Sequence, residues 1–232
     1  MAPNYWLVLP AAGKGERMHA DGTSLPKQYR EIAGRTVLEH ALAPFIADPA
    51  CVGLVVALAP GDARFGGLAV SRDGRLSTVT GGETRADSVR AGLEEVRRRA
   101  GDQDPWVLVH DAARPCLPAG DLATLLAALE DSPDGALLAL PIADTVKRAD
   151  ADGCSHATVP REGLWRAATP QAFRLRTLLA AVAKCPGASD EAGAIEAMGG
   201  RPRLVAGSSA NLKLTTAGDL ALTACLLEGR AP

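Results

Sequence analysis

Short apolar runs that lack polar alternation recur along this chain, separated by segments of helical periodicity. The runs occupy residues 6–9, 52–58, 76–79, 106–109, 136–140 and 203–205. Strands covered by helices on both faces have such sequences, because neither face of the strand meets water. Their alternation with helices predicts an α/β fold, namely a Rossmann-like, mostly parallel sheet with helices on both faces.

Start signals mark the helices expected between these runs. Thr36 and Glu39 have the spacing of a capping box, so one helix should begin there. Pro44 should kink or shorten this helix, because proline lacks the amide hydrogen that an interior turn uses. Three further helices are expected: one over about 84–99, one from about Asp121, and one from Thr216, where Asp219 completes a second capping box.

The composition excludes several classes of protein. With 47% hydrophobic and 22% charged residues, the 232-residue chain can build a substantial core, so residues 1–232 are expected to form a single domain. The formal net charge of −2 gives no electrostatic footprint for nucleic acid. The five cysteines are scattered and include no CxxC pair, so neither a disulfide framework nor structural zinc is expected.

The segment MAPNYWLVLPAAG has no basic region, and its apolar run is too short for a signal peptide. No stretch of the sequence approaches the roughly 20 apolar residues that cross a membrane. We therefore expect a cytoplasmic protein without a membrane partner.

Residues 141–168 interrupt the alternation of strands and helices. This stretch is polar and holds an Asp-Gly pair between valine-containing pieces, which predicts a protruding hairpin, an arm subdomain of the single domain. An arm of this size cannot bury itself, so a partner subunit is expected to cover it. A disordered loop is less favoured, because the stretch includes the apolar residues Val146, Val159, Leu164 and Trp165.

Three loops, at 10–29, 80–88 and 110–118, follow expected strands and so fall at one edge of the sheet. Ligands of open α/β sheets bind beyond the carboxyl ends of the strands. This edge is therefore the expected functional site.

The first of these loops combines glycines with cations. Gly13 and Gly15 let backbone amides approach a phosphate closely, because no Cβ stands in the way. Arg17 and Lys27 add positive charge to the same place. Met18 stands where a dinucleotide-binding loop needs its third glycine, and the ending of a Walker A loop is missing. A nucleoside triphosphate is therefore the expected ligand, and a tight turn with solvated charges is the alternative.

The second and third loops carry weaker signals. Gly81 and Gly82 expose backbone groups that can read a base edge, although a capped helix start at Thr84 explains them equally well. Asp111 follows a strand and can hold Mg²⁺ or a sugar hydroxyl, and Arg114 can clamp a phosphate, with an exposed ion pair as the alternative.

Two further residues next to these signals are assigned to structure. His110 is one of them, since nucleotidyl transfer needs little proton chemistry. Ser189 is expected to be the N-cap of a helix.

Eight sequence pieces occur in one order across nearly the whole chain. They are PAAGKGERM (10–18), PKQY (26–29), GGETRADSV (81–89), VHDAARP (109–115), DTVKR (144–148), TPQ (169–171), SDEA (189–192) and NLKLTT (211–216). This ordered set resembles the 2-C-methyl-D-erythritol 4-phosphate cytidylyltransferase family.

The resemblance implies that CTP and 2-C-methyl-D-erythritol 4-phosphate react to 4-diphosphocytidyl-2-C-methyl-D-erythritol and pyrophosphate, a step of the non-mevalonate isoprenoid pathway. It also implies a homodimer whose arm reaches into the neighbour's site.

The resemblance assigns roles to individual residues. The nucleotide loops would comprise Ala11, Ala12, Gly13, Gly15, Gly81, Gly82, Glu83 and Ser88. The catalytic cations would be Arg17 and Lys27 at the α-phosphate, and Arg161 and Lys213 at the attacking phosphate. The acceptor pocket would add Asp111, Ala112, Arg114, Thr145, Thr169 and Ser189. Of these, Thr145 would come from the second subunit, and Arg114 could do so as well.

Two positions depart from the family pattern. Ser189 stands where the family usually has threonine, which keeps the hydroxyl but loses a methyl group. Glu83 stands where aspartate is expected, so its contact with the ribose is less certain. Mg²⁺ is expected mainly on triphosphate oxygens and water, and no residue is assigned as a metal ligand.

Three other functions compete with this interpretation. A cytidylyltransferase for another polyol phosphate, such as ribitol 5-phosphate, would share the nucleotide half, although Arg161 and Lys213 favour methylerythritol phosphate. An NAD-binding oxidoreductase would need the third glycine and an acidic residue about 20 positions further on. A silent nucleotide-binding module would not need both Arg17 and Lys27.

Overall fold

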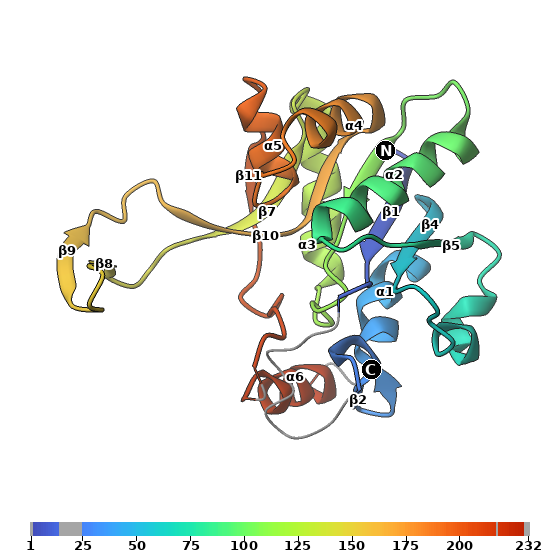
Figure 1. Cartoon of the computed structure of the whole chain (residues 1–232), viewed down its shortest axis with the longest axis horizontal. Coiled ribbons are helices and arrows are strands. Elements are labelled where there is room, and N and C mark those ends of the chain that lie inside the picture. The colour runs from blue at the N-terminus through green and yellow to red at the C-terminus, as the bar shows by residue number, and fades with distance from the viewer. Residues whose placement is uncertain (1, 14–24, 217, 230–232) are drawn as a thin grey trace.

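A seven-stranded sheet forms the centre of the molecule, in the order β11-β7-β10-β6-β1-β4-β5 (Figure 1). The computed structural model describes residues 2–13, 25–216 and 218–229. The strands are β1 (Tyr5–Pro10), β4 (Cys51–Leu58), β5 (Leu76–Thr80), β6 (Trp106–Val109), β7 (Ala136–Pro141), β10 (Trp165–Arg174) and β11 (Arg203–Ala206). Only β10 runs antiparallel to its neighbours in this sheet, so the expected mostly parallel α/β fold is confirmed.

The six strands expected from the apolar runs are all present, but β10 was not expected. This strand contains Pro170 and Gln171, and a proline argues against a central strand because it cannot donate to the ladder. The pairing of β10 with β7 is irregular between Ala167 and Gln171, and its pairing with β6 begins at Gln171. Pro170 therefore lies at the irregularity, where its missing amide does not break a regular ladder.

The helices are α1 (Val37–Ala47), α2 (Arg85–Ala100), α3 (Ala119–Ala128), α4 (Leu175–Lys184), α5 (Glu191–Ala197) and α6 (Gly218–Glu228). The capping box of α1 is confirmed, because the Glu39 amide donates to Thr36 Oγ1 and the Thr36 amide donates to the Glu39 carboxylate. Pro44 does not end α1, which continues to Ala47.

Shorter elements complete the fold. They are the single turns η2 (Lys27–Tyr29), η3 (Phe65–Gly67), η4 (Ala69–Arg72) and η5 (Leu129–Asp131), and the strand pairs β2 (Glu31–Ile32) with β3 (Arg35–Thr36) and β8 (Val146–Ala149) with β9 (Ser155–Val159).

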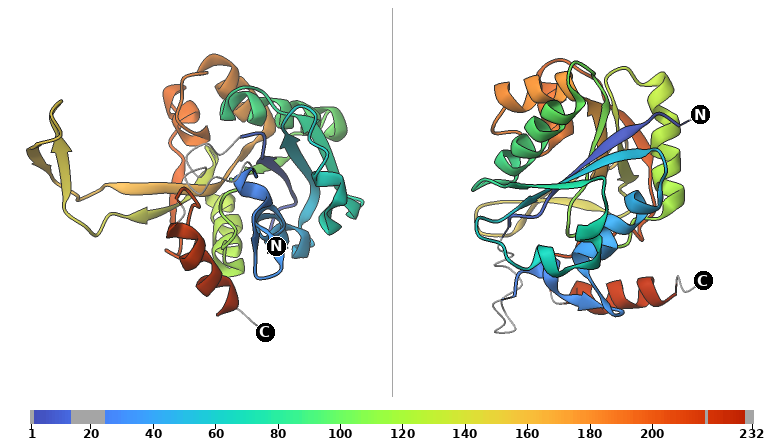
Figure 2. Two further views of the ribbon diagram at one scale, coloured as in Figure 1. Left: turned by 60° about the horizontal axis from the view of Figure 1, so that its bottom comes forward. Right: turned by 90° about the vertical axis from the view of Figure 1, so that its right-hand side faces the viewer.

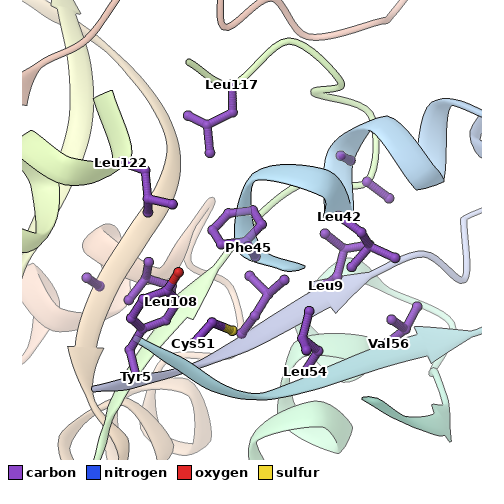
Figure 3. Close-up of a cluster of buried hydrophobic side chains, with 14 of the residues drawn as sticks. Tyr5, Leu9, Leu42, Phe45, Cys51, Leu54, Val56, Leu108, Leu117 and Leu122 are labelled. Atoms are coloured by element: carbon purple, nitrogen blue, oxygen red, sulfur yellow. The ribbon is translucent and has the colours of Figure 1, made fainter. Parts of the chain in front are cut away.

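The inner strands β1, β4 and β6 are buried on both faces, since their successive side chains point to opposite faces and each face meets a helical layer. In β1, Leu7 and Leu9 pack with α1 and α3, and Val8 packs with α2 on the other side. Figure 3 shows the first of these clusters, where Phe45 of α1 lies above the strands near Leu108 and Leu117. The right-hand view of Figure 2 shows the sheet between the two helical layers.

The arm of β8 and β9 projects from the sheet between β7 and β10 (Figure 1). Its side chains are mostly exposed, including Trp165 at its base. On another side of the molecule, α6 lies beside β2 and packs against a small cluster that contains Leu214 and Ala113. None of the helices in the described part of the chain has the length and apolar composition of a membrane span.

Candidate active site

Two loops meet at the carboxyl edge of the sheet, above the end of β4. The Ala11 amide donates to Ala57 O at 2.8 Å, and the Gly81 amide donates to Leu58 O at 2.7 Å. A Cβ at Gly81 would lie 2.6 Å from the Ala12 Cβ and 2.7 Å from Ser88 Oγ. Glycine is therefore required at position 81 because the loops touch there.

A side chain that sequence reasoning missed holds the first loop in place. Gln28 is buried, and its Nε2 donates to Ala11 O at 2.8 Å and to Gly13 O at 3.3 Å. Its neighbour Lys27 donates to Leu214 O at 3.2 Å. Gly15 and Arg17 lie outside the described residues.

The second loop is fixed by its own helix. Ser88 is buried, accepts a bond from the Gly82 amide at 3.2 Å and lies 3.1 Å from Thr84 O, to which its hydroxyl donates. Thr84 is the N-cap of α2 and forms a capping box with Asp87. Glu83 is exposed at the tip of the loop. The turn thus presents its backbone and Glu83 outward, while Ser88 supports it from below.

Asp111, which follows β6, is the centre of a charged cluster with Arg85, Arg114, Glu191 and Lys213. Its Oδ1 accepts from Arg85 Nε at 2.9 Å. Its Oδ2 lies 2.8 Å from Lys213 Nζ and 3.6 Å from Arg114 Nε. Arg85 also donates both terminal nitrogens to the Glu191 carboxylate, at 2.7 and 3.0 Å. We call these five residues the Asp111 cluster.

Burial and charge compete in this cluster. Burial alone would raise the pKa of Asp111, but the charges of Arg85, Lys213 and Arg114 hold that pKa below its ordinary value. Burial would lower the pKa of Arg85, but Glu191 and Asp111 raise it above its ordinary value. Burial lowers the pKa of the Arg114 guanidinium. The carboxylate is therefore ionised, and both of its oxygens lie next to cations.

His110 and Thr169 support Asp111 from below. His110 is completely buried, and burial lowers its pKa to about 4, so its ring is neutral. Its Nε2 lies 3.1 Å from Arg114 O, which can only accept, so Nε2 carries the proton. Its Nδ1 then accepts from the Thr169 hydroxyl at 3.1 Å, and that hydroxyl accepts from the Asp111 amide. The structural role expected of His110 agrees with these contacts.

The segment 211–214 crosses the site and contacts both β10 and the loop that follows β6. The Asn211 Nδ2 donates to Thr169 O at 2.7 Å, and Arg114 Nη1 donates to Asn211 O at 2.8 Å. The Leu214 amide donates to Ala113 O at 2.7 Å. Asn211 and Gln28 belong to motifs of the family resemblance, but nothing in their residue type singled them out.

The expectation that Ser189 caps a helix is wrong. The N-cap of α5 is the next residue, Asp190, whose Oδ1 accepts from the Gly193 amide at 2.9 Å. The Asp190 Oδ2 accepts from Gln171 Nε2 at 2.8 Å, which ties α5 to β10. Ser189 is left exposed just before the helix. Both residue types cap helices well, so only the backbone distinguishes them.

Two expected site residues lie on the arm. Thr145 is exposed directly before β8, and Arg161 follows β9 and donates to Ala143 O within the arm. Within the part of the chain that the structure describes, neither side chain forms a hydrogen bond or an ion pair with the Asp111 cluster. Ala112, by contrast, is buried beside Asp111.

The described side chains do not form a protein-only magnesium site. No three His, Cys, Asp or Glu residues in the described ranges gather where they could hold a metal ion. Asp111 and Glu191 are engaged by arginine and lysine nitrogens. A divalent ion at this site would therefore need oxygen ligands from a substrate and from water.

A mostly parallel sheet with amide-lined loops at its carboxyl edge, beside a cationic cluster, is typical of an α/β nucleotidyltransferase. Comparison with known proteins gives the family. Residues 5–229 match the family model of 2-C-methyl-D-erythritol 4-phosphate cytidylyltransferase, and the chain belongs to this family.

Curated relatives have the same length as this chain. The 2-C-methyl-D-erythritol 4-phosphate cytidylyltransferase of Dechloromonas aromatica is 49% identical over 230 residues, which cover 98% of this chain and 99% of the relative. The enzyme of that name from Acidithiobacillus ferrooxidans is 47% identical in an alignment of 234 positions, which covers 97% of this chain and 97% of the relative.

Solved structures agree with the fold. A crystal structure of 4-diphosphocytidyl-2C-methyl-D-erythritol synthase has a TM-score of 0.85 at 38% identity and covers 98% of this chain and 99% of the other. The Francisella tularensis 2-C-methyl-D-erythritol 4-phosphate cytidylyltransferase has a TM-score of 0.80 at 32% identity and covers 96% of this chain and 99% of the other.

Proposed function

We propose that this chain transfers the cytidylyl group of CTP to 2-C-methyl-D-erythritol 4-phosphate, releasing pyrophosphate, in the non-mevalonate isoprenoid pathway. One observation carries the proposal beyond family membership. Lys213 of the segment 211–214 belongs to the Asp111 cluster. Lys27, beside the nucleotide loop, donates to the carbonyl of Leu214 in the same segment. The sites proposed for the nucleotide and for the acceptor therefore adjoin at this segment.

The nucleotide half is made of backbone. The loops 11–13 and 81–82 bring amides and carbonyls together at the sheet edge, where they can bind a triphosphate and the edge of cytosine. Glu83, exposed at the tip of the second loop, would contact the ribose. Lys27, together with Arg17 outside the described residues, would offset negative charge at the α-phosphate.

The acceptor half is the Asp111 cluster. Asp111 can accept a hydrogen bond from a sugar hydroxyl, and Lys213 and Arg114 can bind the acceptor phosphate. An oxygen of that phosphate attacks the α-phosphorus, the bond to the bridging oxygen breaks, and pyrophosphate leaves. Two anions must meet, so the main contribution of the protein is charge and orientation. No covalent intermediate on the protein is needed.

Magnesium is proposed to arrive with CTP. Phosphate oxygens and water are its preferred ligands, and an ion held there would neutralise part of the triphosphate charge. The protein residues then act on the phosphates directly, and Asp111 keeps its cationic partners.

A test of the acceptor uses two alcohol phosphates. With CTP and Mg²⁺, we expect pyrophosphate release with 2-C-methyl-D-erythritol 4-phosphate and at least roughly tenfold lower kcat/KM with ribitol 5-phosphate. Equal or better use of ribitol 5-phosphate would replace the proposed acceptor.

We also propose a homodimer in which the arm of each subunit, with Thr145 and Arg161, completes the acceptor site of the other. The apolar side chains Leu164 and Trp165 at the base of the arm are exposed, and the arm of β8 and β9 extends away from the central sheet (Figure 1). The free thiols Cys154 and Cys225 are exposed and suit the reducing cytoplasm, where we place the enzyme.

Mixed dimers test this arrangement. Arg161→Ala damages the arm and Lys213→Ala damages the cluster, so a dimer with one of each has one intact site only if the arm acts in the partner. After unfolding and refolding together, an equal mixture should regain about one quarter of wild-type activity, given a symmetric dimer. No gain over the separate variants would show that the arm does not act across the interface.

A further inference from the structure

Two helices that approach the site from different parts of the chain are joined at their first residues. Arg85 begins α2 and Glu191 begins α5, and the two Nη atoms of Arg85 donate to the two oxygens of Glu191 at 2.7 and 3.0 Å. Glu191 is only 3% exposed. A two-point contact of this kind fixes the plane of the guanidinium as well as its position.

The third nitrogen of Arg85 faces the site. Its Nε donates to Asp111 Oδ1 at 2.9 Å, which leaves Asp111 Oδ2 for Lys213 at 2.8 Å. Charges therefore alternate along a line from Glu191 through Arg85 and Asp111 to Lys213. The two carboxylates of this line are buried, whereas the Arg85 side chain is 33% exposed and the Lys213 side chain at the end of the line is 40% exposed.

The line has a consequence for an incoming anion. Arg85, Arg114 and Lys213 face two carboxylates, so the cluster holds one positive charge in excess. Because Arg85 and Arg114 also face Asp111, Lys213 is not the sole counter-ion of that carboxylate. Its ammonium group can then be shared with a phosphate at the exposed end of the line.

We propose that Arg85 and Glu191 are positioning residues for the acceptor phosphate: through Asp111 they hold Lys213 at the place where that phosphate binds. This proposal rests on the proposed function of the site. Neither residue contacts the reacting atoms, and their effect on the acceptor is transmitted by the fixed carboxylate of Asp111.

Charge-conserving variants separate position from charge. Arg85→Lys keeps the cation but has one nitrogen in place of three, and Glu191→Asp keeps the carboxylate but is one carbon shorter. Both avoid an uncompensated buried charge, so both are expected to fold. The controls are Arg98→Lys and Glu95→Asp, because Arg98 and Glu95 form a similar two-point pair on the exposed face of the same helix.

Steady-state kinetics with each substrate varied in turn gives the decisive result. For Arg85→Lys and Glu191→Asp we expect the KM of the acceptor phosphate to rise roughly tenfold or more, with the KM of CTP within about twofold of wild type. The exposed-pair controls should leave both constants unchanged. Melting temperatures measured alongside identify any general loss of folding.

An unchanged acceptor KM in both variants, with or without a lower melting temperature, would make the pair purely structural and overturn the proposal. Equal rises in the KM of both substrates would do the same. If the wild-type protein itself fails to use CTP with the acceptor, the proposed function fails first. Isothermal titration with inorganic phosphate then tests the pair alone, since weaker phosphate binding in both variants is still expected and unchanged binding would refute it.

Discussion

The Nζ of Lys213 lies 2.8 Å from Oδ2 of Asp111, although the two residues are far apart in the sequence and belong to different segments of the site. This contact joins the loop after β6 to the segment 211–214. It places the exposed ammonium of Lys213 next to a carboxylate that is already paired with Arg85. A phosphate that binds here meets an oriented cation.

Removing that cation should weaken the acceptor selectively. For Lys213→Ala we expect the KM of the acceptor phosphate to rise on the order of 10- to 100-fold, the scale of one lost charge-assisted hydrogen bond. The KM of CTP should change little. Lys184→Ala, which removes an exposed lysine at the end of α4, is the matched control. Unchanged acceptor kinetics in the Lys213 variant would remove this residue from the pocket.

Lys27 is expected to act on the transition state. Lys27→Ala should lower kcat on the order of 10²-fold or more, as when one contact to the developing charge is lost. The fold should survive, because Lys27 lies in the single turn η2 and is not part of the hydrophobic core clusters. Single-turnover rates and circular dichroism check the two statements. Near-normal turnover of a folded variant would contradict the role.

The contact between the two nucleotide loops can be tested at Gly81. A Cβ there would lie 2.6 Å from the Ala12 Cβ, so Gly81→Ala must push the loops apart. Misplacement near the reacting groups can cost roughly 10²-fold, and we expect a loss of that order in kcat/KM for CTP. Gly74→Ala is the control, because a Cβ there meets nothing within 4 Å. Equal kinetics in the two variants would show that the loops do not need to touch.

The buried His110 should make stability depend on pH. Its folded pKa of about 4 lies below the unfolded value of 6.5, so the unfolded chain binds more protons between these two values. Stability should be constant above about pH 6.5 and should fall by about 3 kcal/mol as the pH drops to 4. Asp111 loses its contribution at lower pH, since its pKa is held below its ordinary value of 3.8.

Urea unfolding between pH 7 and pH 4 measures this slope. His110→Gln is the matched variant, because glutamine can also donate to Arg114 O and accept from Thr169 but does not titrate. Its unfolding free energy should be nearly flat over the window. The same slope in both proteins would assign the pH dependence to other groups.

The sheet was predictable because its strands are buried on both faces and so carry continuous apolar runs. The strand β10 does not follow this rule. Pro170 lies at an irregular pairing, and the side chain of the buried Gln171 is hydrogen-bonded to Asp190 and to the Ala192 amide. A polar residue in a strand leaves no apolar signal, even when its hydrogen bonds are satisfied by distant parts of the chain.

The site was predictable in its motifs and less so in its contacts. Asp111 and the glycine loops stood out by residue type and position, whereas Lys213 received its role only from the family resemblance. The pairing of Arg85 with Glu191 spans 106 residues of sequence, and no local pattern announces a partner at that distance. Likewise, Ser189 and Asp190 are both good helix caps, and the choice between them depends on a backbone that tertiary packing sets.

Pyrophosphate release tests the central claim most directly. The protein is incubated with Mg²⁺, 2-C-methyl-D-erythritol 4-phosphate and, in turn, CTP, UTP, ATP and GTP, with and without the acceptor. We expect release with CTP that depends on the acceptor and that falls sharply in Lys27→Ala. Release without the acceptor, equal use of another nucleotide, or no release with CTP would contradict the account.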